Sequence, residues 1–399
     1  MLPSLLRKMH EFSRRLVIRV MLIALLAVLS VGLAKLLSGL IPEAWDGLVG
    51  KDAVDHILSI IANSMLTVTT FSLTVMAAAH RNVSSQWTPR AHQMLLQDTT
   101  THTVLATFVG AYLYALLAII LRDTGIFVHQ GLAVLFGMTM LVVAMIVIAI
   151  IRWISHLEML GSLIETSQKI EDQTAVAYEM RAEYPALGAR ILDVAQIPES
   201  ASNVYAHQTG YVQKIYQDLL QDAAKDAEAC IWLLHPVGGF VHKGQILARV
   251  DREGEALLDT VRRNVAIGSL RNFEQDPIFG LICLSEIAVR ALSPGVNDPG
   301  TAVDMMRRIT RVLMDVNDPL NGADHEILHD RLFLPELERA ELVSRPLEPI
   351  LHDWNRRPEM LEAMHQTLDA LSEHHDPDVA GAARKLRAET FAEQMNVPQ

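Results

Sequence analysis

The first 155 residues of the chain contain four long apolar runs, and the residues that follow, up to residue 399, are mostly polar. The hydrocarbon core of a bilayer is about 30 Å thick, so a helix needs about 20 residues to cross it. We therefore expect a membrane protein with a four-helix transmembrane domain over residues 1–155, followed by a cytosolic α+β domain. The expected transmembrane α-helices lie near residues 16–41, 54–79, 103–121 and 128–154.

Charges beside the apolar runs predict the orientation, because Lys and Arg in short flanks favour the cytoplasmic side. The basic flank contains Arg7, Lys8, Arg14, Arg15 and Arg19, and the acidic first loop contains Glu43, Asp46, Asp52 and Asp55. The first run is too long for a cleaved signal and lacks a small-residue cleavage site, so we expect it to stay as an anchor. We expect both termini on the cytoplasmic side of a bacterial inner membrane, with Cys230 and Cys283 as reduced thiols.

The charge of the chain divides at the same place as its hydropathy. Residues 1–152 carry 11 Lys and Arg against 7 Asp and Glu, whereas the rest of the chain carries 23 against 39. An acidic domain disfavours a nucleic-acid partner, which needs a basic face, although acidity is also common in any soluble domain. Because no phosphate loop, nucleophile elbow or dinucleotide fingerprint occurs in the sequence, we expect neither enzyme activity nor a cofactor.

The second apolar run carries hydroxyl and amide side chains at steps of three or four residues, which places them on one helix face. These residues are Ser59, Asn63, Thr67, Thr70 and Thr74. An unsatisfied polar group in hydrocarbon is costly, so such a face meets another helix or water. Two interpretations stay open: hydrogen bonding between helices, or a pore wall that several copies build around an axis.

Small residues in the third and fourth runs predict close approach of helices. They are Gly110, Gly131 and Gly137. No acidic or basic residue lies deep inside the second, third or fourth run, which disfavours a proton-coupled pump. Passive conduction or a purely structural bundle remains.

The loop between the second and third runs contains Gln86, Trp87, Pro89 and Arg90. An aromatic residue beside an arginine is typical of the headgroup level, so we expect this loop to couple the membrane part to the following domain. The loop reads Ser-Ser-Gln-Trp-Thr-Pro-Arg, and a second block over residues 275–302 contains Gln-Asp-Pro-Ile-Phe-Gly and Ser-Pro-Gly-Val-Asn-Asp-Pro-Gly. Together they resemble the bacterial membrane-protein family known as domain of unknown function 2254. The resemblance spans nearly the whole chain and implies an architecture but no activity.

The second block also predicts local structure. A helix is expected over residues 277–292, followed by a turn and by a second helix that Asp298 caps and Pro299 opens. Glu286 and Arg290, four residues apart, have the spacing of an ion pair. A helix start beside an arginine could instead hold a phosphate or carboxylate, although Asp298 already fills the cap and repels anions. The residues singled out in this motif are Asp276, Glu286, Arg290, Asn297, Asp298 and Pro299.

Residues 191–255 predict a β-rich module, and its segments look like the two halves of a biotinyl/lipoyl-type barrel-sandwich. The expected strands are 210–215, 231–234 and 238–248, with a polar helix over 216–228. The lysine hairpin that carries the cofactor in true lipoyl domains is missing, and Lys243 lies in the wrong part of the pattern. We expect a structural adaptor without a swinging-arm cofactor.

The remaining segments are expected to be helical. A helix over residues 156–184, within a stalk of residues 156–190, continues the fourth span and either bundles around an oligomer axis or packs on its own subunit. Charged residues such as Glu171 and Arg181 predict that its polar face is solvated. Residues 256–399 predict a mainly helical domain, with His374 in a solvated turn.

One string matches the zinc-protease pattern H-E-x-x-H, namely His325-Glu326-Ile327-Leu328-His329. Two histidines four residues apart on a helix could bind zinc, with the glutamate as the base that activates water. The extended form of the motif is absent, because Leu332 and Pro335 stand where it requires Gly and His. An ordinary amphipathic helix is the favoured interpretation.

Our leading hypothesis is a channel-like homo-oligomer in which the second span lines a path for ions or small solutes, with the cytosolic domain regulating or assembling it. The first alternative is a non-conducting membrane scaffold or signalling protein that recruits cytosolic partners. The second alternative is a membrane-anchored zinc protease that uses His325, Glu326 and His329.

Overall fold

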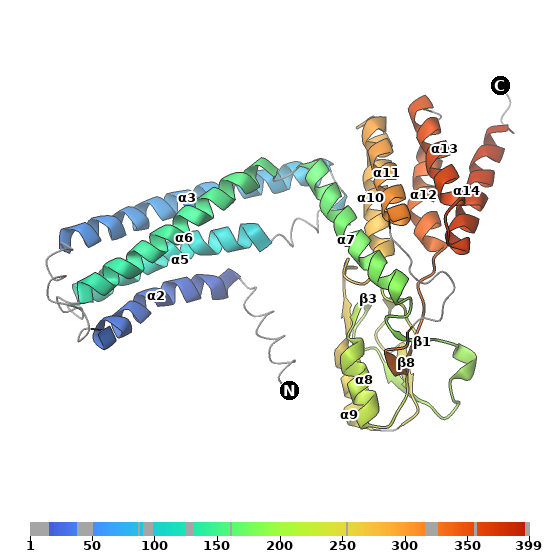
Figure 1. Cartoon of the computed structure of the whole chain (residues 1–399), viewed down its shortest axis with the longest axis horizontal. Helices are drawn as coiled ribbons and strands as arrows, with labels where there is room; N and C mark the ends of the chain where they lie inside the picture. Colours follow the sequence, from blue (N-terminus) through green and yellow to red (C-terminus); the bar gives the residue numbers. More distant parts are fainter. Residues whose placement is uncertain are drawn as a thin grey trace. The chain divides into compact units, whose positions relative to one another are not determined.

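The structure of the protein is a computed structural model, and the chain divides into two compact units (Figure 1). The described residues are 16–37, 51–86, 88–90, 99–124, 131–159, 162–252, 254–315, 326–354 and 357–395. The membrane unit comprises residues 1–86 and 92–162, and the α+β unit comprises residues 87–91 and 163–399. Each unit is described by itself.

The described part of the membrane unit contains four apolar helices. They are α2 (Leu16–Leu37), α3 (Lys51–Gln86), α5 (Thr99–Asp123) and α6 (Gly131–Met159). Helix α5 packs against the other three, and Phe108 and Tyr114 from it lie fully buried in the common core. Three stretches are long and apolar enough to cross a membrane, namely Ala53–Ala79, Thr100–Asp123 and Ala133–Leu157, and α2 contributes the shorter Ile18–Leu33. The protein is therefore a membrane protein with three or four N-terminal apolar helices.

The glycines of these helices have different surroundings. A Cβ atom on Gly110 would lie 2.7 Å from the Cβ atom of Ile23, so α2 and α5 approach closely at this point, as the sequence predicts. At Gly137 an added Cβ would meet nothing within 4 Å, so the predicted close approach there is wrong within a single chain. The surroundings of Gly131 lie outside the described residues. Tyr114 and Thr139 join α5 to α6 by a buried hydrogen bond of 3.1 Å between their hydroxyls.

The expected continuous helix after the fourth span consists of two helices. Helix α6 ends at Met159, and α7 (Leu163–Glu183) begins at Leu163. The sequence between them includes Gly161 and Ser162, two poor helix formers. Helix α7 packs against α10 (Pro277–Leu292) and α11 (Pro299–Asp315). Of the two arrangements considered for it, the structure has the one in which it packs on its own subunit.

The β part of the α+β unit consists of two sheets. The first has the order β1 (Ala189–Ile191), β8 (His329–Leu334), β4 (Ile231–Leu233), β6 (Ile246–Val250) and β2 (Ser202–Tyr205). The second has the order β5 (Phe240–Val241), β3 (Gly210–Ile215) and β7 (Val265–Gly268). The strands expected over 210–215 and 231–234 are present as β3 and β4, whereas the segment 238–248 contributes two strands, β5 and β6, to different sheets. The expected polar helix is α8 (Gln217–Asp226), and α9 (Glu255–Asn264) follows β6. Strands β7 and β8 follow residue 255, the expected end of the module, and β8 pairs in parallel with β1 and β4.

These sheets enclose one apolar core, to which most of their strands contribute buried side chains. Val212, Ile215, Leu233 and Leu247 are among its buried side chains, and Leu332 from β8 joins them. A strand distant in the sequence thus completes the sheet that the module begins.

The C-terminal part is helical, as expected, with α12 (Glu341–Asp353), α13 (Pro358–Ser372) and α14 (Pro377–Met395) (Figure 1). Helix α10 is central, since it packs against α7, α11 and α12. The prediction of a solvated turn at His374 is wrong, because this residue is 6% exposed. Its Nε2 lies 3.0 Å from the Leu313 carbonyl oxygen, and its Nδ1 accepts a 3.0 Å hydrogen bond from the Asp376 main chain.

Candidate functional site

The hydroxyl and amide residues of α3 lie together on the exposed side of that helix. Ser59, Asn63, Thr67, Thr70 and Thr74, the α3 polar face, are all exposed in the single chain. The opposite side of α3 enters the core of the membrane unit through Val54, Leu58, Ile61, Ala62 and Met65. Only 22% of the most apolar stretch of α3 is buried, against 56% of the corresponding stretch of α5.

The threonines of the α3 polar face bond to their own helix. The hydroxyl of Thr67 donates to the Asn63 carbonyl oxygen at 3.2 Å, that of Thr70 to the Thr67 carbonyl at 2.9 Å, and that of Thr74 to the Thr70 carbonyl at 2.9 Å. Within the described residues, the side-chain amide of Asn63 has no such bond. No other described helix of the membrane unit covers this face.

Ion pairs and polar contacts lie near the ends of the apolar helices. Asp55, in the first turns of α3, forms an ion pair with Arg122 at the end of α5. The Thr101 hydroxyl lies 3.0 Å from Nε2 of His156, and both residues are buried. Charged groups therefore mark the ends of the bundle, while α3 carries no ionisable residue between His56 and His80.

The loop between α3 and α5 contributes a short described segment, residues 88–90, to the α+β unit. We call it the coupling segment. Thr88 is buried, and Arg90 forms an ion pair with Glu286 of α10. The spacing in α10 predicts Arg290 as the partner of Glu286, whereas the structure brings Arg90 to this carboxylate from a residue 196 positions away. Gln86 is the last residue of α3, and Trp87 lies outside the described residues.

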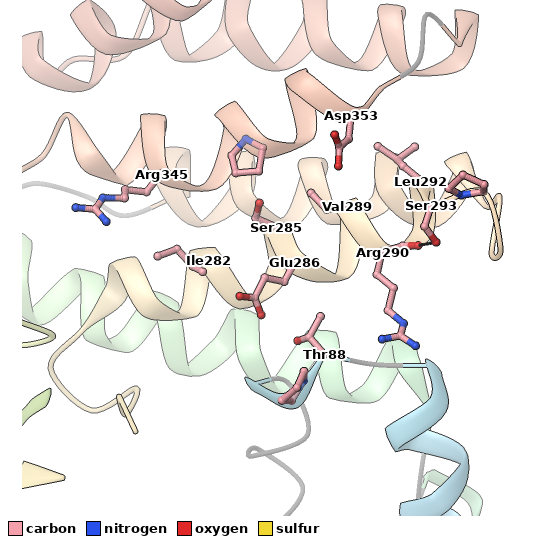
Figure 2. Close-up of a pocket in the computed structure, with 13 residues that line it drawn as sticks. Thr88, Ile282, Ser285, Glu286, Val289, Arg290, Leu292, Ser293, Arg345 and Asp353 are labelled. Carbon is pink, nitrogen blue, oxygen red and sulfur yellow. Dashed lines mark hydrogen bonds between the residues drawn. The ribbon is translucent and has the colours of Figure 1, made fainter. Parts of the chain in front are cut away.

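A cavity of about 590 Å³ lies between the coupling segment, α10 and α12. Its apolar lining comes from Pro89, Ile282, Val289, Leu292, Pro294 and Pro349. Figure 2 shows the Glu286 side chain directed from α10 toward the part of the chain that carries Thr88, with Arg345 and Asp353 on α12. The volume falls in the range of small-molecule sites, and mostly apolar walls with a few polar groups are typical of such sites.

The Gln-Asp-Pro-Ile-Phe-Gly block fixes the start of α10. The Gln275 amide pairs with Ile215 of β3, accepting from its main-chain N–H at 2.9 Å and donating to its carbonyl at 3.1 Å. Asp276 caps α10 by accepting from the Phe279 N–H, and Arg271 binds its carboxylate at 2.7 Å through two nitrogens. A Cβ atom on Gly280 would lie 1.9 Å from Oγ1 of Thr174, so glycine is needed where α7 crosses α10.

The Ser-Pro-Gly-Val-Asn-Asp-Pro block forms the turn between α10 and α11. Asn297 adopts a left-handed conformation with φ of 53°, and Arg357 donates to its side-chain oxygen at 2.8 Å. Asp298 accepts from the Thr301 hydroxyl and main-chain N–H at 2.6 and 3.1 Å, and these bonds lower the pKa of its carboxyl. The cap is thus filled just before Pro299, which supports the structural interpretation of this motif over an anion site.

Two charged residues of α7 were expected on a solvated face, and this prediction is wrong. Glu171 is 5% exposed and lies 2.6 Å from Arg308 and 2.9 Å from Arg311, both on α11. Arg181 is 3% exposed, and burial lowers its pKa to about 10, against the opposing effect of Asp276. Sequence periodicity does not distinguish a buried ion pair from a solvated one, because the partner is more than 130 residues away.

The predicted helix around the H-E-x-x-H string is also wrong. His329 is the first residue of β8, Glu326 and Leu328 are exposed, and His325 lies outside the described residues. Burial lowers the pKa of His329, whose Nε2 lies 3.6 Å from Oδ1 of Asp218. A zinc site of this pattern needs both histidines on one helix face, and a strand does not provide that spacing. In the described part of the chain, no three His, Cys, Asp or Glu side chains gather as metal ligands would.

The chain belongs to the family described as "Predicted membrane protein (DUF2254)", whose sequence model matches residues 13–370, and the resemblance stated from the motifs is confirmed. It is 26% identical over 337 residues to an uncharacterized protein of Mycobacterium tuberculosis (strain H37Rv), and equally to one of Mycobacterium bovis. Each match covers 80% of this chain and 63% of the relative, so the chain spans less than two thirds of these curated relatives. No solved structure matches.

Proposed function

We propose that the protein is a channel-like homo-oligomer of the bacterial inner membrane, in which the α3 polar faces of several copies line a common path. The observation that carries this proposal is the position of Asn63 and its neighbours, exposed on the side of α3 opposite the buried residues. In a bilayer this side meets lipid, a neighbouring protein or water.

The cost of facing lipid differs along the α3 polar face. Back-bonded hydroxyls such as those of Thr70 and Thr74 tolerate an apolar surrounding, because their protons already have an acceptor. The Asn63 amide has two N–H donors and an acceptor oxygen, and leaving such a group unsatisfied in hydrocarbon costs about 2–7 kcal/mol. Copies arranged around an axis remove that cost by exposing Asn63 to water.

The packing inside one membrane unit supports a path shared between copies. Phe108, Tyr114 and Ala118 of the central helix α5 are fully buried against the surrounding helices. Four spans enclose little room once such side chains fill it. The path therefore belongs to the assembly.

We propose that all four apolar helices cross the membrane and that both termini are cytoplasmic. The basic N-terminal flank and the acidic first loop support this orientation. The cytosol keeps thiols reduced, and burial raises the pKa of Cys283 to about 12, which makes that thiol unreactive. The α+β unit then regulates or assembles the path from the cytosolic side through the coupling segment.

Reconstitution into liposomes tests the proposed path. Purified full-length protein is expected to give an ion flux, and Asn63→Leu to reduce it, because leucine removes the polar group and narrows the wall. Ile148→Leu is the matched control, since Ile148 is an exposed apolar residue of α6. If the correctly oligomeric protein conducts no ions across varied voltage, pH and membrane tension, the channel proposal is overturned.

The second candidate is a non-conducting scaffold or signalling protein that recruits cytosolic partners. The cavity beside the coupling segment favours it, because a bound molecule there contacts both Pro89 and α10. Absence of flux together with saturable binding to the α+β unit would support this candidate instead.

We also propose that the protein has no enzymatic role. The strand at His329 supports this, because it removes the helical spacing of the zinc-protease pattern. Metal analysis of purified protein and of the His329→Ala variant is the test. Stoichiometric zinc in the wild type that the variant loses would contradict the proposal.

A further inference from the structure

The α3 polar face presents hydrogen-bond acceptors more than donors to whatever lies in front of it. Each threonine hydroxyl has one proton and two lone pairs. The protons of Thr67, Thr70 and Thr74 are used in bonds of 3.2, 2.9 and 2.9 Å to main-chain carbonyl oxygens of the same helix. Their lone pairs stay available on the exposed side.

The apolar part of α3 carries no charged side chain, so the hydroxyl dipoles of the α3 polar face are its main electrostatic feature. The helix has no Asp, Glu, Lys, Arg or His between His56 and His80. Only Ser59 and Asn63 add side-chain donors to the α3 polar face, and Asn63 adds an acceptor as well. In such a wall, the orientation of the hydroxyls decides the sign of the ions that it favours.

We propose that the path conducts small monovalent cations in preference to anions, an inference that rests on the proposed function. Oxygen lone pairs replace part of the hydration shell of a cation, as carbonyl oxygens do in selectivity filters. An anion requires N–H or O–H donors. Three of the five side chains of this face already donate their hydroxyl proton to a main-chain carbonyl oxygen of α3. Because the wall carries dipoles and no full charge, the preference is graded, not absolute.

The neighbouring residues Thr69 and Thr70 provide a matched pair for the test. Thr69 is 8% exposed and bonds to the Met65 carbonyl oxygen at 2.6 Å, so its hydroxyl faces the core of the membrane unit. Thr70 is exposed on the α3 polar face. Substitution by valine keeps the branched shape of either residue and removes only its hydroxyl.

The experiment measures the reversal potential of full-length protein in planar bilayers under a KCl gradient. Wild type and Thr69→Val are expected to show the same preference for K⁺ over Cl⁻. Thr70→Val is expected to lose about fivefold of that preference, the ratio that corresponds to about 1 kcal/mol for one hydrogen bond. The separate variant Thr70→Ser is expected to keep the wild-type preference, because serine retains the hydroxyl oxygen as an acceptor.

The outcomes separate this inference from the proposed function. A conducting protein that prefers Cl⁻, or that does not discriminate, overturns cation preference and leaves the path in place. Equal loss of preference in Thr69→Val and Thr70→Val also overturns it, because the buried hydroxyl would then matter as much as the exposed one. A protein that conducts nothing overturns the path itself and this inference with it.

Discussion

In the α+β unit the buried Glu171 carboxylate forms ion pairs with Arg308 and Arg311, whereas in the membrane unit the side chains of the α3 polar face are exposed on the side away from the core. Gln275, also in the α+β unit, exchanges two hydrogen bonds with Ile215 of a neighbouring strand. Both units thus contain polar residues on helices that pack into a core. Each unit supplies some partners from the same chain, as Thr139 does for Tyr114, but among the described residues the threonines of the α3 polar face bond only to their own helix.

The two units differ in whether their polar side chains find hydrogen-bond or ion-pair partners within one chain. A buried charge in water-soluble protein needs a partner, because desolvation is otherwise too costly, and Glu171 has two. The Asn63 amide faces outward in a unit built to lie in lipid, where no water competes for it. Glu171 and Gln275 are therefore satisfied within a single chain, whereas under the proposed function further copies supply what the α3 polar face meets.

The largest expected effect tests the buried ion pairs. Glu171→Ala removes the buried carboxylate partner of Arg308 and leaves it only the half-exposed carboxylate of Asp304 at 2.9 Å, and breaking a buried pair costs up to about 3–5 kcal/mol. Hydrogen exchange of the full-length protein should show lost protection in α7 and α11. Glu165→Ala is the control, since Glu165 pairs with Lys169 at 3.4 Å on the surface, where such pairs are worth about 1 kcal/mol or less. If both variants lost the same protection from exchange, the buried Glu171 pairs would contribute no more than a surface pair, contrary to the comparison between the units.

A smaller effect separates the inner and outer surfaces of the membrane unit. Gly110→Ala places a methyl group 2.7 Å from the Cβ atom of Ile23 and should lower the stability of the unit by about 1–3 kcal/mol, the usual cost of overpacking. Gly137→Ala meets open space and should be neutral. Thermal unfolding in detergent measures both. A neutral Gly110→Ala variant would contradict the close packing of α2 on α5.

The next prediction concerns assembly through the α3 polar face. Asn63→Leu removes the amide that a single copy would expose to lipid and should weaken the oligomer at least about fivefold, because assembly then no longer avoids the cost of an unsatisfied amide in hydrocarbon, about 2–7 kcal/mol. Native mass measurements over a range of detergent concentrations follow the change. The exposed Ile148→Leu substitution on α6 should leave the equilibrium unchanged. If the Asn63→Leu and Ile148→Leu oligomers were equally stable, the α3 polar face would not lie between copies.

The smallest effect comes from the buried His374. Burial lowers its pKa below the ordinary value of 6.5, and the neighbouring His375 acts in the same direction, while the Leu313 carbonyl and Asp376 oppose both. Asp376 is itself ion-paired with Arg339. A histidine with a depressed pKa in the folded state contributes stability above the unfolded pKa, and this is lost as the pH falls through the folded pKa.

The test measures unfolding midpoints of the full-length protein between about pH 7.5 and about pH 5, an interval that contains the ordinary histidine pKa of about 6.5. The α+β unit should lose stability as the pH falls, and His374→Gln should flatten the dependence. The exposed His242→Gln variant is the control. A dependence that is steeper in acid for His374→Gln than for wild type would contradict the assignment.

The sequence by itself determined the elements whose signals are local. The apolar runs marked α3, α5 and α6, because their length and hydropathy depend only on neighbouring residues. The cap residue Asp298 marked where α11 begins, since a cap acts within three residues of itself. Alternation marked the strands around Val212 and Leu247 for the same reason.

Only the tertiary structure decided which faces are buried and which distant residues meet. The same histidine spacing that favours a helix became the start of β8 at His329, because pairing with β1 and β4 outweighs a weak local preference. Glu286 met Arg90, and Glu171 met Arg308, across separations that no periodicity encodes. The outward direction of Asn63 was decided in the same way, since a helical stripe fixes which residues share a face but leaves open what that face meets.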